Sequence, residues 1–241
     1  MDVTVELHQW IRAAARLVIL SGAGMSAESG VPTFRDAQTG LWANFRPEEL
    51  ATPEAFRARP AFVWDWYEER RARMRDVAPH AGHLAIADFQ RRHPGRLTVV
   101  TQNVDGLHQR AGSPDVLALH GQIAQDTWLD PPRPCCEAAP PVPGRPPACG
   151  VCGNLRRPAV VWFGEMLPAR ELAQAERAAR DCDLMLVVGT SGVVYPAAGL
   201  ARATRGRVVV INPHESDLDD AADLVVRGTA AAVLPKVLAD A

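Results

Sequence analysis

Lysine is nearly absent from this sequence: Lys236 is the single lysine among 26 basic residues, and all the others are arginines. We interpret this imbalance as a compositional bias of the genome and not as a functional feature. Net charge is also low, because 28 acidic residues leave a formal charge of −2. A chain so close to neutrality lacks the excess of basic residues typical of proteins that bind nucleic acid or anionic membranes. We therefore expect neither partner.

Long apolar runs are missing as well. Runs such as Leu17–Leu20 and Leu184–Val188 are far shorter than the roughly 20 residues that a membrane-spanning helix needs. The N-terminal segment carries Asp2 and Glu6 and lacks the apolar core of a signal peptide. These absences predict a cytoplasmic protein.

Apolar β-branched runs alternate with helical patterns along most of the chain. The expected strands cover Leu17–Leu20, Leu97–Val100, Val116–Leu119, Leu184–Val188, Val208–Ile211 and Leu224–Val226. The expected helices cover Val5–Arg16, Ala61–Arg75, Gly82–Arg92, Pro168–Arg180, Pro196–Thr204 and Ala230–Ala239. Because continuous apolar runs suit a sheet that is covered on both faces, the pattern predicts an α/β fold with a Rossmann-like, doubly wound parallel sheet.

Two segments interrupt this alternation. A helical insertion rich in Trp and Arg is expected over residues 47–76, and a small lobe with clustered cysteines over residues 128–158. The proline density of Pro131–Pro158 argues against a helix or a central strand there. We expect a single domain whose Rossmann-like part comprises residues 1–46, 77–127 and 159–241, with a zinc-ribbon-like lobe inserted into it.

The loop after the first expected strand is rich in glycine. Gly22-Ala23-Gly24, followed by Ala27, loosely fits the pattern in which backbone N–H groups bind a pyrophosphate. The acidic residue that ordinary dehydrogenases carry after their second strand is not evident at the usual distance, because that stretch is the helical insertion. A hydride-transferring dehydrogenase is therefore disfavoured.

The longer stretch Gly22–Arg35 resembles the signature of the sirtuins, a family of NAD-dependent protein lysine deacylases. Further matching segments follow in the order of the family: Thr101–His108, Leu119–Gly121, Val160–Glu165, Gly189–Ser191 and Ile211–Asn212. The resemblance covers nearly the whole chain. It implies a reaction that consumes NAD and an acylated lysine side chain of a protein, and that yields free lysine, nicotinamide and O-acyl-ADP-ribose.

The resemblance assigns the catalytic roles to His120 and Asn103. The ordinary pKa of imidazole, near 6.5, suits a general base at cellular pH. Asn103 and Asp105 would hold the ribose and the nicotinamide carboxamide, and Phe34 would shield the reactive ribose carbon from water. The implied NAD-binding residues are Gly22, Ala23, Gly24, Ser26, Glu28, Thr33, Phe34, Arg35, Trp42, Gln102, Asn103, Asp105, Gly189, Thr190, Ser191, Asn212 and Ala230.

Tyr67 and Arg70 lie three residues apart and thus on one face of an expected helix. A guanidinium beside a phenol can bind a carboxylate. Together with Ala51, this pair resembles the bacterial class III branch of the family, which removes succinyl, malonyl and glutaryl groups. Surface ion pairs with Glu68 and Glu69 are the alternative explanation for Arg70. A substrate peptide is expected to lie as an added strand between two edges of the protein, whose residues are Val161, Phe163, Gly164, Glu165 and Val193.

Four cysteines, Cys135, Cys136, Cys149 and Cys152, lie within 18 residues, which indicates a metal site more than disulfides in a reducing compartment. The family's zinc site uses two Cys-x-x-Cys pairs, but Trp128 and Pro131 stand where the first pair would fall. Adjacent ligands such as Cys135 and Cys136 would strain the backbone. Two interpretations therefore stay open: a structural four-cysteine zinc site, or a lobe with lost or weakened metal binding.

Other activities remain compatible with these motifs. One is mono-ADP-ribosyl transfer on the same fold, and another is a non-catalytic module that binds NAD or metal. Intact His120, Asn103 and Asp105 favour catalysis over the module. We expect a monomer.

Overall fold

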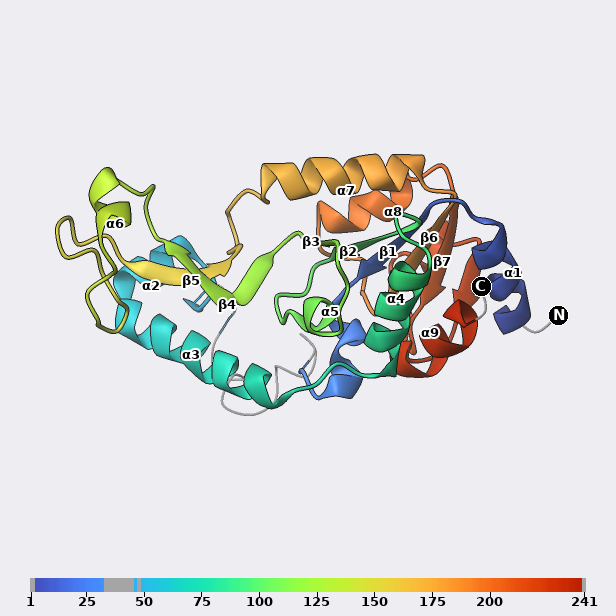
Figure 1. Ribbon diagram of the computed structural model, residues 1–241, viewed down its shortest axis with the longest axis horizontal. Helices are drawn as coiled ribbons and strands as arrows, with labels where there is room; N and C mark the ends of the chain where they lie inside the picture. Colours follow the sequence, from blue (N-terminus) through green and yellow to red (C-terminus); the bar gives the residue numbers. More distant parts are fainter. Residues whose placement is uncertain (1–2, 33–45, 47–48, 240–241) are drawn as a thin grey trace.

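The computed structural model describes residues 3–32, 46 and 49–239 of the chain. Its centre is a six-stranded parallel sheet with the strand order β3-β2-β1-β6-β7-β8 (Figure 1). The strands are β1 (Leu17–Ser21), β2 (Leu97–Thr101), β3 (Val116–Ala118), β6 (Leu184–Val188), β7 (Arg207–Ile211) and β8 (Leu224–Val226). Each expected apolar run forms one of them, which confirms the predicted doubly wound parallel sheet.

The strand order reverses direction between β1 and β6. From β1 the chain proceeds outward to β2 and β3, and its second half starts again at β6 on the other side of β1. Loops that leave neighbouring strands on opposite sides open a crevice at such a point, where open α/β sheets bind ligands.

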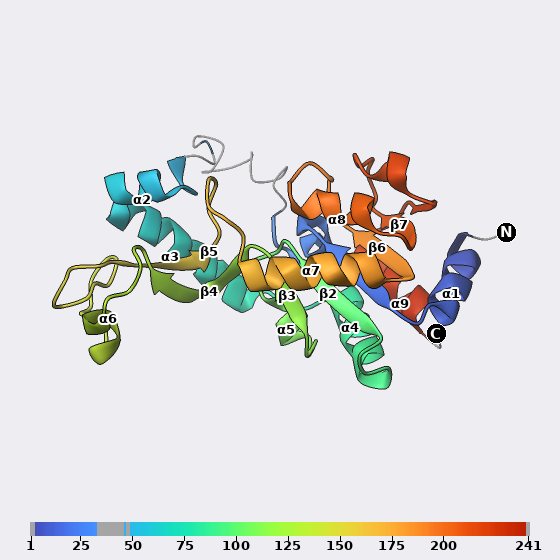
Figure 2. The same cartoon turned by 90° about the horizontal axis from the view of Figure 1, so that it is seen from above.

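Helices cover both faces of the sheet (Figures 1 and 2). One face carries α1 (Val3–Ala13), α4 (Ala81–Arg92) and α9 (Ala230–Leu238), and the other carries α7 (Ala169–Asp181) and α8 (Ala197–Ala203). Successive side chains of a strand point to opposite faces. Leu17 and Ile19 accordingly join the first apolar core, whereas Val18 and Leu20 join the second.

A smaller body packs around a second sheet. Its strands β4 (Gly121–Trp128) and β5 (Arg156–Val160) are antiparallel, and α2 (Pro53–Ala58) and α3 (Pro60–Asp76) lie beside them (Figure 1). The third apolar core joins these helices to this sheet. It consists of Phe56, Val63, Trp64, Tyr67, Ile123, Val160 and Trp162.

The proline-rich segment contains a helix that the sequence did not predict. This helix, α6 (Pro134–Ala138), is a single turn with Pro134 in its first position. A proline is tolerated there because the first N–H groups of a helix have no intrahelical partner. The expectation of no helix between Pro131 and Pro158 was therefore wrong. Strand β5 includes Pro158, but this sheet has only two strands, so each is an edge strand where proline is tolerated.

The remaining short elements are α5 (Leu107–Arg110) and the 3₁₀ turns η1 (Ala23–Met25), η2 (Ala27–Ser29) and η6 (Asp219–Ala221). In the described part of the chain, no helix is long and apolar enough to cross a membrane.

Candidate active site

The glycine-rich loop after β1 packs against the turn after β6, backbone against backbone. Gly24 donates its N–H to the carbonyl of Gly189 at 2.8 Å. A Cβ on Gly24 would lie 2.8 Å from Gly189 Cα, and a Cβ on Gly22 would lie 2.7 Å from the Cβ of Thr190. Gly189 also has a φ of +60°, which favours glycine. The loop therefore needs glycines in order to pack this closely against the turn after β6, at the point where the strand order reverses.

Three polar side chains meet beside this loop. Ser26 Oγ donates to Asp105 Oδ2 at 2.7 Å, and Asn103 Nδ2 donates to Ser26 Oγ at 3.1 Å and to the carbonyl of Gly22 at 2.9 Å. Burial raises the pKa of Asp105, although hydrogen bonds from the N–H of Leu107 and from Ser26 oppose that shift. The structure thus brings Asn103 and Asp105, which follow β2, into contact with Ser26 of the first loop.

His120 lies in the turn between β3 and β4. Its Nδ1 is 2.9 Å from the carbonyl of Gln102. A carbonyl can only accept, so Nδ1 carries the proton and Nε2 is the unprotonated nitrogen of the neutral ring. Burial lowers the pKa of His120, and the hydrogen bond to Gln102 opposes that shift. The ring is therefore held as a neutral base with Nε2 as its acceptor atom.

Gln102, expected at a ribose, and the expected adenosine-side residues lie at the ends of β2, β6 and β7. Gln102 Nε2 is 3.3 Å from Thr190 Oγ1, and Asn212 Nδ2 donates to the Thr190 carbonyl at 3.0 Å. The carbonyl of Ser191 accepts from the N–H of Asp217 at 2.9 Å. These contacts align the residues along one edge of the sheet.

Glu28 and Ala230 lie together, at the joint between η2 and α9. The Glu28 carboxylate accepts from Thr229 Oγ1 at 2.8 Å and from the N–H of Ala231 at 2.7 Å, and Ala230 is buried beside them. The other expected cofactor residues, Thr33, Phe34, Arg35 and Trp42, lie outside the described residues.

Tyr67 and Arg70 lie on one face of α3, as the spacing predicts. Tyr67 is only 5% exposed, and its hydroxyl accepts a 2.8 Å hydrogen bond from Trp162 Nε1. Burial raises the pKa of Tyr67 to about 12 and lowers that of Arg70. The Arg70 guanidinium lies 4.7 Å from the centre of the Trp66 ring, and its buried Nε has no hydrogen-bond partner among the described residues.

The alternative of surface ion pairs does not fit Arg70. Glu68 pairs with Arg71 and Glu69 pairs with Arg73. In the part of the chain that the structure describes, the buried Nε of Arg70 therefore has no partner, and Arg70 lies about one helical turn from Tyr67 in α3. Ala51 packs against the same apolar core, and its carbonyl accepts from the N–H of Phe163 at 2.9 Å.

The residues expected to contact a peptide line two exposed edges. Val161, Phe163 and Gly164 follow β5, and Val193 follows β6; Phe163 is 51% and Val193 59% exposed. Glu165 is different, because its carboxylate forms an ion pair with Arg157 and accepts from the N–H of Trp162 at 2.8 Å. It holds the turn after β5. Neither Arg157 nor Trp162 was named as a site residue. Arg157 falls in the proline-rich segment, and Trp162 lies in the matching segment Val160–Glu165 without a role of its own.

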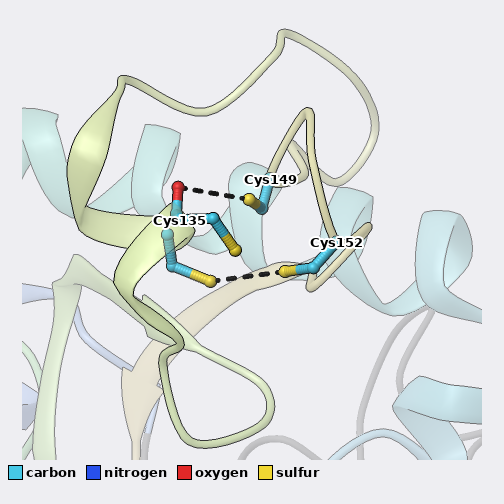
Figure 3. Close-up of side chains that lie close together, drawn as sticks. Cys135, Cys149 and Cys152 are labelled. Atoms are coloured by element: carbon cyan, nitrogen blue, oxygen red, sulfur yellow. Dashed lines mark hydrogen bonds between the residues drawn. The ribbon is translucent and has the colours of Figure 1, made fainter.

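The four clustered cysteines converge from two segments (Figure 3). Helix α6 supplies Cys135 and Cys136, and a tight turn supplies Cys149 and Cys152, with all four sulfurs within 4.8 Å of one another. A tetrahedral zinc site with Zn–S bonds of about 2.3 Å would place its sulfurs about 3.8 Å apart. Backbone N–H groups of Cys152 and Val151 lower the pKa of Cys149 to about 7, towards the thiolate that binds metal.

This geometry favours the four-cysteine site over a lobe without metal. The adjacent pair fits because it lies on a helical turn, not on an extended strand. Four thiolates leave no position for water on a tetrahedral ion, so zinc held here would be structural.

Comparisons with known proteins agree with this geometry. The Sir2 family model matches residues 22–196. An NAD-dependent protein deacylase of Ralstonia nicotianae is 57% identical over 97% of this chain and 95% of its own length. NAD-dependent protein deacylase 1 of Pseudomonas aeruginosa is 48% identical over 99% of this chain and 98% of its own length.

Solved structures point the same way. A Sir2 homologue in complex with NAD has a TM-score of 0.85 at 43% identity and covers 97% of this chain and 92% of its own. A complex of Sir2 with a p53 peptide and NAD⁺ has a TM-score of 0.80 at 30% identity, over 97% of this chain and 96% of its own. The chain belongs to the Sir2 family.

Proposed function

We propose that this protein is an NAD-dependent deacylase that acts on acylated lysine side chains of proteins. The observation that carries the proposal is His120, a neutral imidazole with an unprotonated Nε2 beside the Ser26–Asn103–Asp105 cluster, where the strand order reverses. Relatives that are 57% and 48% identical over nearly their whole length are named NAD-dependent protein deacylases.

The residues present fit NAD. Gly22 and Gly24 use their own N–H groups on the carbonyls of Val188 and Gly189, which holds the loop close to the turn after β6. Between them, Ala23 begins the turn η1, and the first N–H groups of helical turns can bind a pyrophosphate. Asn103 and Asp105 would hold the nicotinamide half, and Asn212 the adenosine half. When bound, NAD supplies an electrophilic ribose carbon and a leaving group, nicotinamide.

The role of His120 follows from its tautomer. Nε2 accepts the proton of a ribose hydroxyl, which makes that oxygen a better nucleophile. The imidazolium that forms keeps its Nδ1–H directed at the Gln102 carbonyl, 2.9 Å away, so the positive charge is stabilised by an acceptor already in place. No reorientation of the ring is needed.

We further propose that the acyl pocket accepts acidic groups such as succinyl and malonyl in addition to acetyl. Support comes from the buried, unpartnered Nε of Arg70 and from the protonated hydroxyl of Tyr67, which lies one helical turn away in α3 and within the third apolar core. A terminal carboxylate of the acyl group would satisfy both donors. An acetyl group would leave both donors unused, so we expect deacetylation to persist.

The peptide around the lysine would add a strand between Val161–Gly164 and Val193, with affinity from backbone hydrogen bonds. Five free cysteines fit a reducing compartment, and we propose a cytoplasmic protein that acts as a monomer on other proteins. The cysteine lobe would hold structural zinc.

The test is to incubate the protein with NAD and matched acetylated or succinylated peptides and to identify the products by mass spectrometry. Free lysine peptide, nicotinamide and O-acyl-ADP-ribose from both peptides are the expected result. ADP-ribose attached to protein without loss of the acyl group would instead indicate mono-ADP-ribosyl transfer. If only the acetylated peptide is processed, the result supports deacylation but contradicts the proposal that the pocket accepts acidic acyl groups.

A further inference from the structure

Trp162 lies between the peptide edge and the expected acyl pocket. Its neighbours in sequence, Val161 and Phe163, are partly or largely exposed, whereas Trp162 is only 2% exposed. The indole points into the apolar core that contains Tyr67, and the two ring centroids are 6.3 Å apart. The segment expected to bind the peptide thus contacts the acyl pocket through this side chain.

The direction of the hydrogen bond between these residues is fixed by chemistry. Indole Nε1–H can only donate, so the Tyr67 oxygen, 2.8 Å away, must be the acceptor. A phenolic hydrogen prefers the plane of its ring and therefore has two favoured positions. A donor that approaches from one side leaves the hydrogen on the other side. The pKa of about 12 keeps that hydrogen in place at any cellular pH.

Trp162 is itself held tightly. The guanidinium of Arg157, which is 5% exposed, stacks 3.5 Å from the centre of the indole ring. Arg157 also forms an ion pair with Glu165, whose carboxylate accepts the backbone N–H of Trp162. The indole has little freedom to turn its N–H away from Tyr67.

We propose that the indole N–H of Trp162 is a positioning and specificity-determining group for acidic acyl substrates, because it directs the hydroxyl hydrogen of Tyr67 towards the acyl carboxylate. The inference rests on the acidic pocket proposed above. It adds that selectivity depends on a residue of the peptide-binding segment that does not touch the acyl group. Without this N–H, the Tyr67 hydroxyl can turn and present its lone pairs to the carboxylate, which repels them.

The test compares kinetics on succinylated and acetylated versions of one peptide. Trp162→Phe keeps an aromatic ring in the core but removes the N–H. We expect it to lower the ratio of kcat/KM for the succinyl peptide to kcat/KM for the acetyl peptide about 10- to 100-fold, the effect of one misdirected hydrogen bond to a charged group. Trp64→Phe, a matched loss of an indole from the same core, should affect the two substrates alike.

A double-mutant cycle with Tyr67→Phe separates orientation from packing. If Trp162 acts through the Tyr67 hydroxyl, the succinyl-specific loss caused by Trp162→Phe disappears once that hydroxyl is gone. Equal losses on both substrates, or an undiminished loss in the Tyr67→Phe background, would overturn the inference. If Arg70→Met selectively lowers desuccinylation while Trp162→Phe does not, only this inference fails. If wild-type protein does not process the succinyl peptide, the acidic pocket and the inference fail together.

Discussion

At the scale of single residues, the proposed chemistry depends on the protonation state of His120. Burial lowers its pKa, so the neutral base persists to lower pH than it does for a free imidazole. We expect the acid limb of the profile of kcat/KM against pH to have its midpoint below about 6.5, the ordinary value for histidine. His120→Ala should lower the rate about 10²- to 10⁴-fold and remove this limb. A limb of unchanged midpoint in the variant would show that another group is the base.

Gly189 offers a second prediction at this scale. A Cβ there would overlap the backbone N of Met25, and φ is +60°. Gly153 has a similar φ of +72°, but nothing lies within 4 Å of its Cβ position. In both Gly189→Ala and Gly153→Ala, an alanine in the left-handed backbone region costs about 1–2 kcal/mol of stability. Only Gly189→Ala should also raise KM for NAD, because only there does the new Cβ collide with the glycine-rich loop. Equal KM values would mean that the close approach of the two loops does not shape the cofactor site.

The resemblance to the sirtuins assigns Asn103, Asp105 and Asn212 to the site, and each of them follows an apolar run. The ends of parallel strands meet at one edge of a sheet, which is why such residues lie near one another. The contact of Trp162 with Tyr67 could not be predicted, since it joins residues 95 positions apart. No local pattern distinguishes an indole that orients a hydroxyl from one that only fills a core.

At the scale of elements, α3 is held against β4 by Arg71. Its side chain is 11% exposed and donates to the carbonyls of Ile123 and Gln125 at 2.5 and 2.8 Å, and to Asp126 at 2.6 Å. These bonds span the register shift between Gln122 and Asp126, where the ladder with β5 is interrupted. The irregular strand thus gains partners from the helix that carries Tyr67 and Arg70, the residues of the proposed acyl pocket.

Loss of this contact should therefore cost stability. Arg71→Met leaves the part-buried carbonyl of Ile123, the carbonyl of Gln125 and the carboxylate of Asp126 without this donor, and we expect about 2–3 kcal/mol of destabilisation by urea unfolding. Arg73→Met removes only an exposed pair with Glu69 and should cost at most about 0.5 kcal/mol. Similar midpoints for the two variants would contradict the role given to Arg71.

The elements of the main sheet were predictable, whereas those of the small body were less so. Strand β4 has the sequence GQIAQDTW, in which only Ile123 is fully buried, so no apolar run marks it. Helix α6 is one turn in a proline-rich segment, and its formation coincides with the convergence of the cysteines. In both cases tertiary contacts, not local propensity, decide the structure.

At the scale of the whole molecule, the cysteine lobe lies at one end and the parallel sheet at the other (Figure 1). The lobe has few buried apolar side chains around its cysteines, so metal binding should supply much of its stability. We expect a zinc chelator to increase amide hydrogen exchange in residues 130–155 first, before exchange in β1 and β6 rises. Uniform loss of protection would mean that the two bodies unfold as one unit.

Acid should destabilise the whole fold through two buried histidines beneath the glycine-rich loop. Burial lowers the pKa of His83 to about 2 and of His108 to about 4. Below about pH 6.5, the ordinary pKa of histidine, these two rings bind protons in the unfolded chain but not in the folded chain. The free energy of unfolding therefore falls as the pH drops from 6.5 towards 4, by about 1.4 kcal/mol per pH unit for each ring. His83→Phe should reduce that slope by about one ring's share. Unfolding midpoints in urea at pH 6.5, 5.5 and 4.5 measure the slope, and identical slopes for the variant and the wild-type protein would exclude His83 as a source.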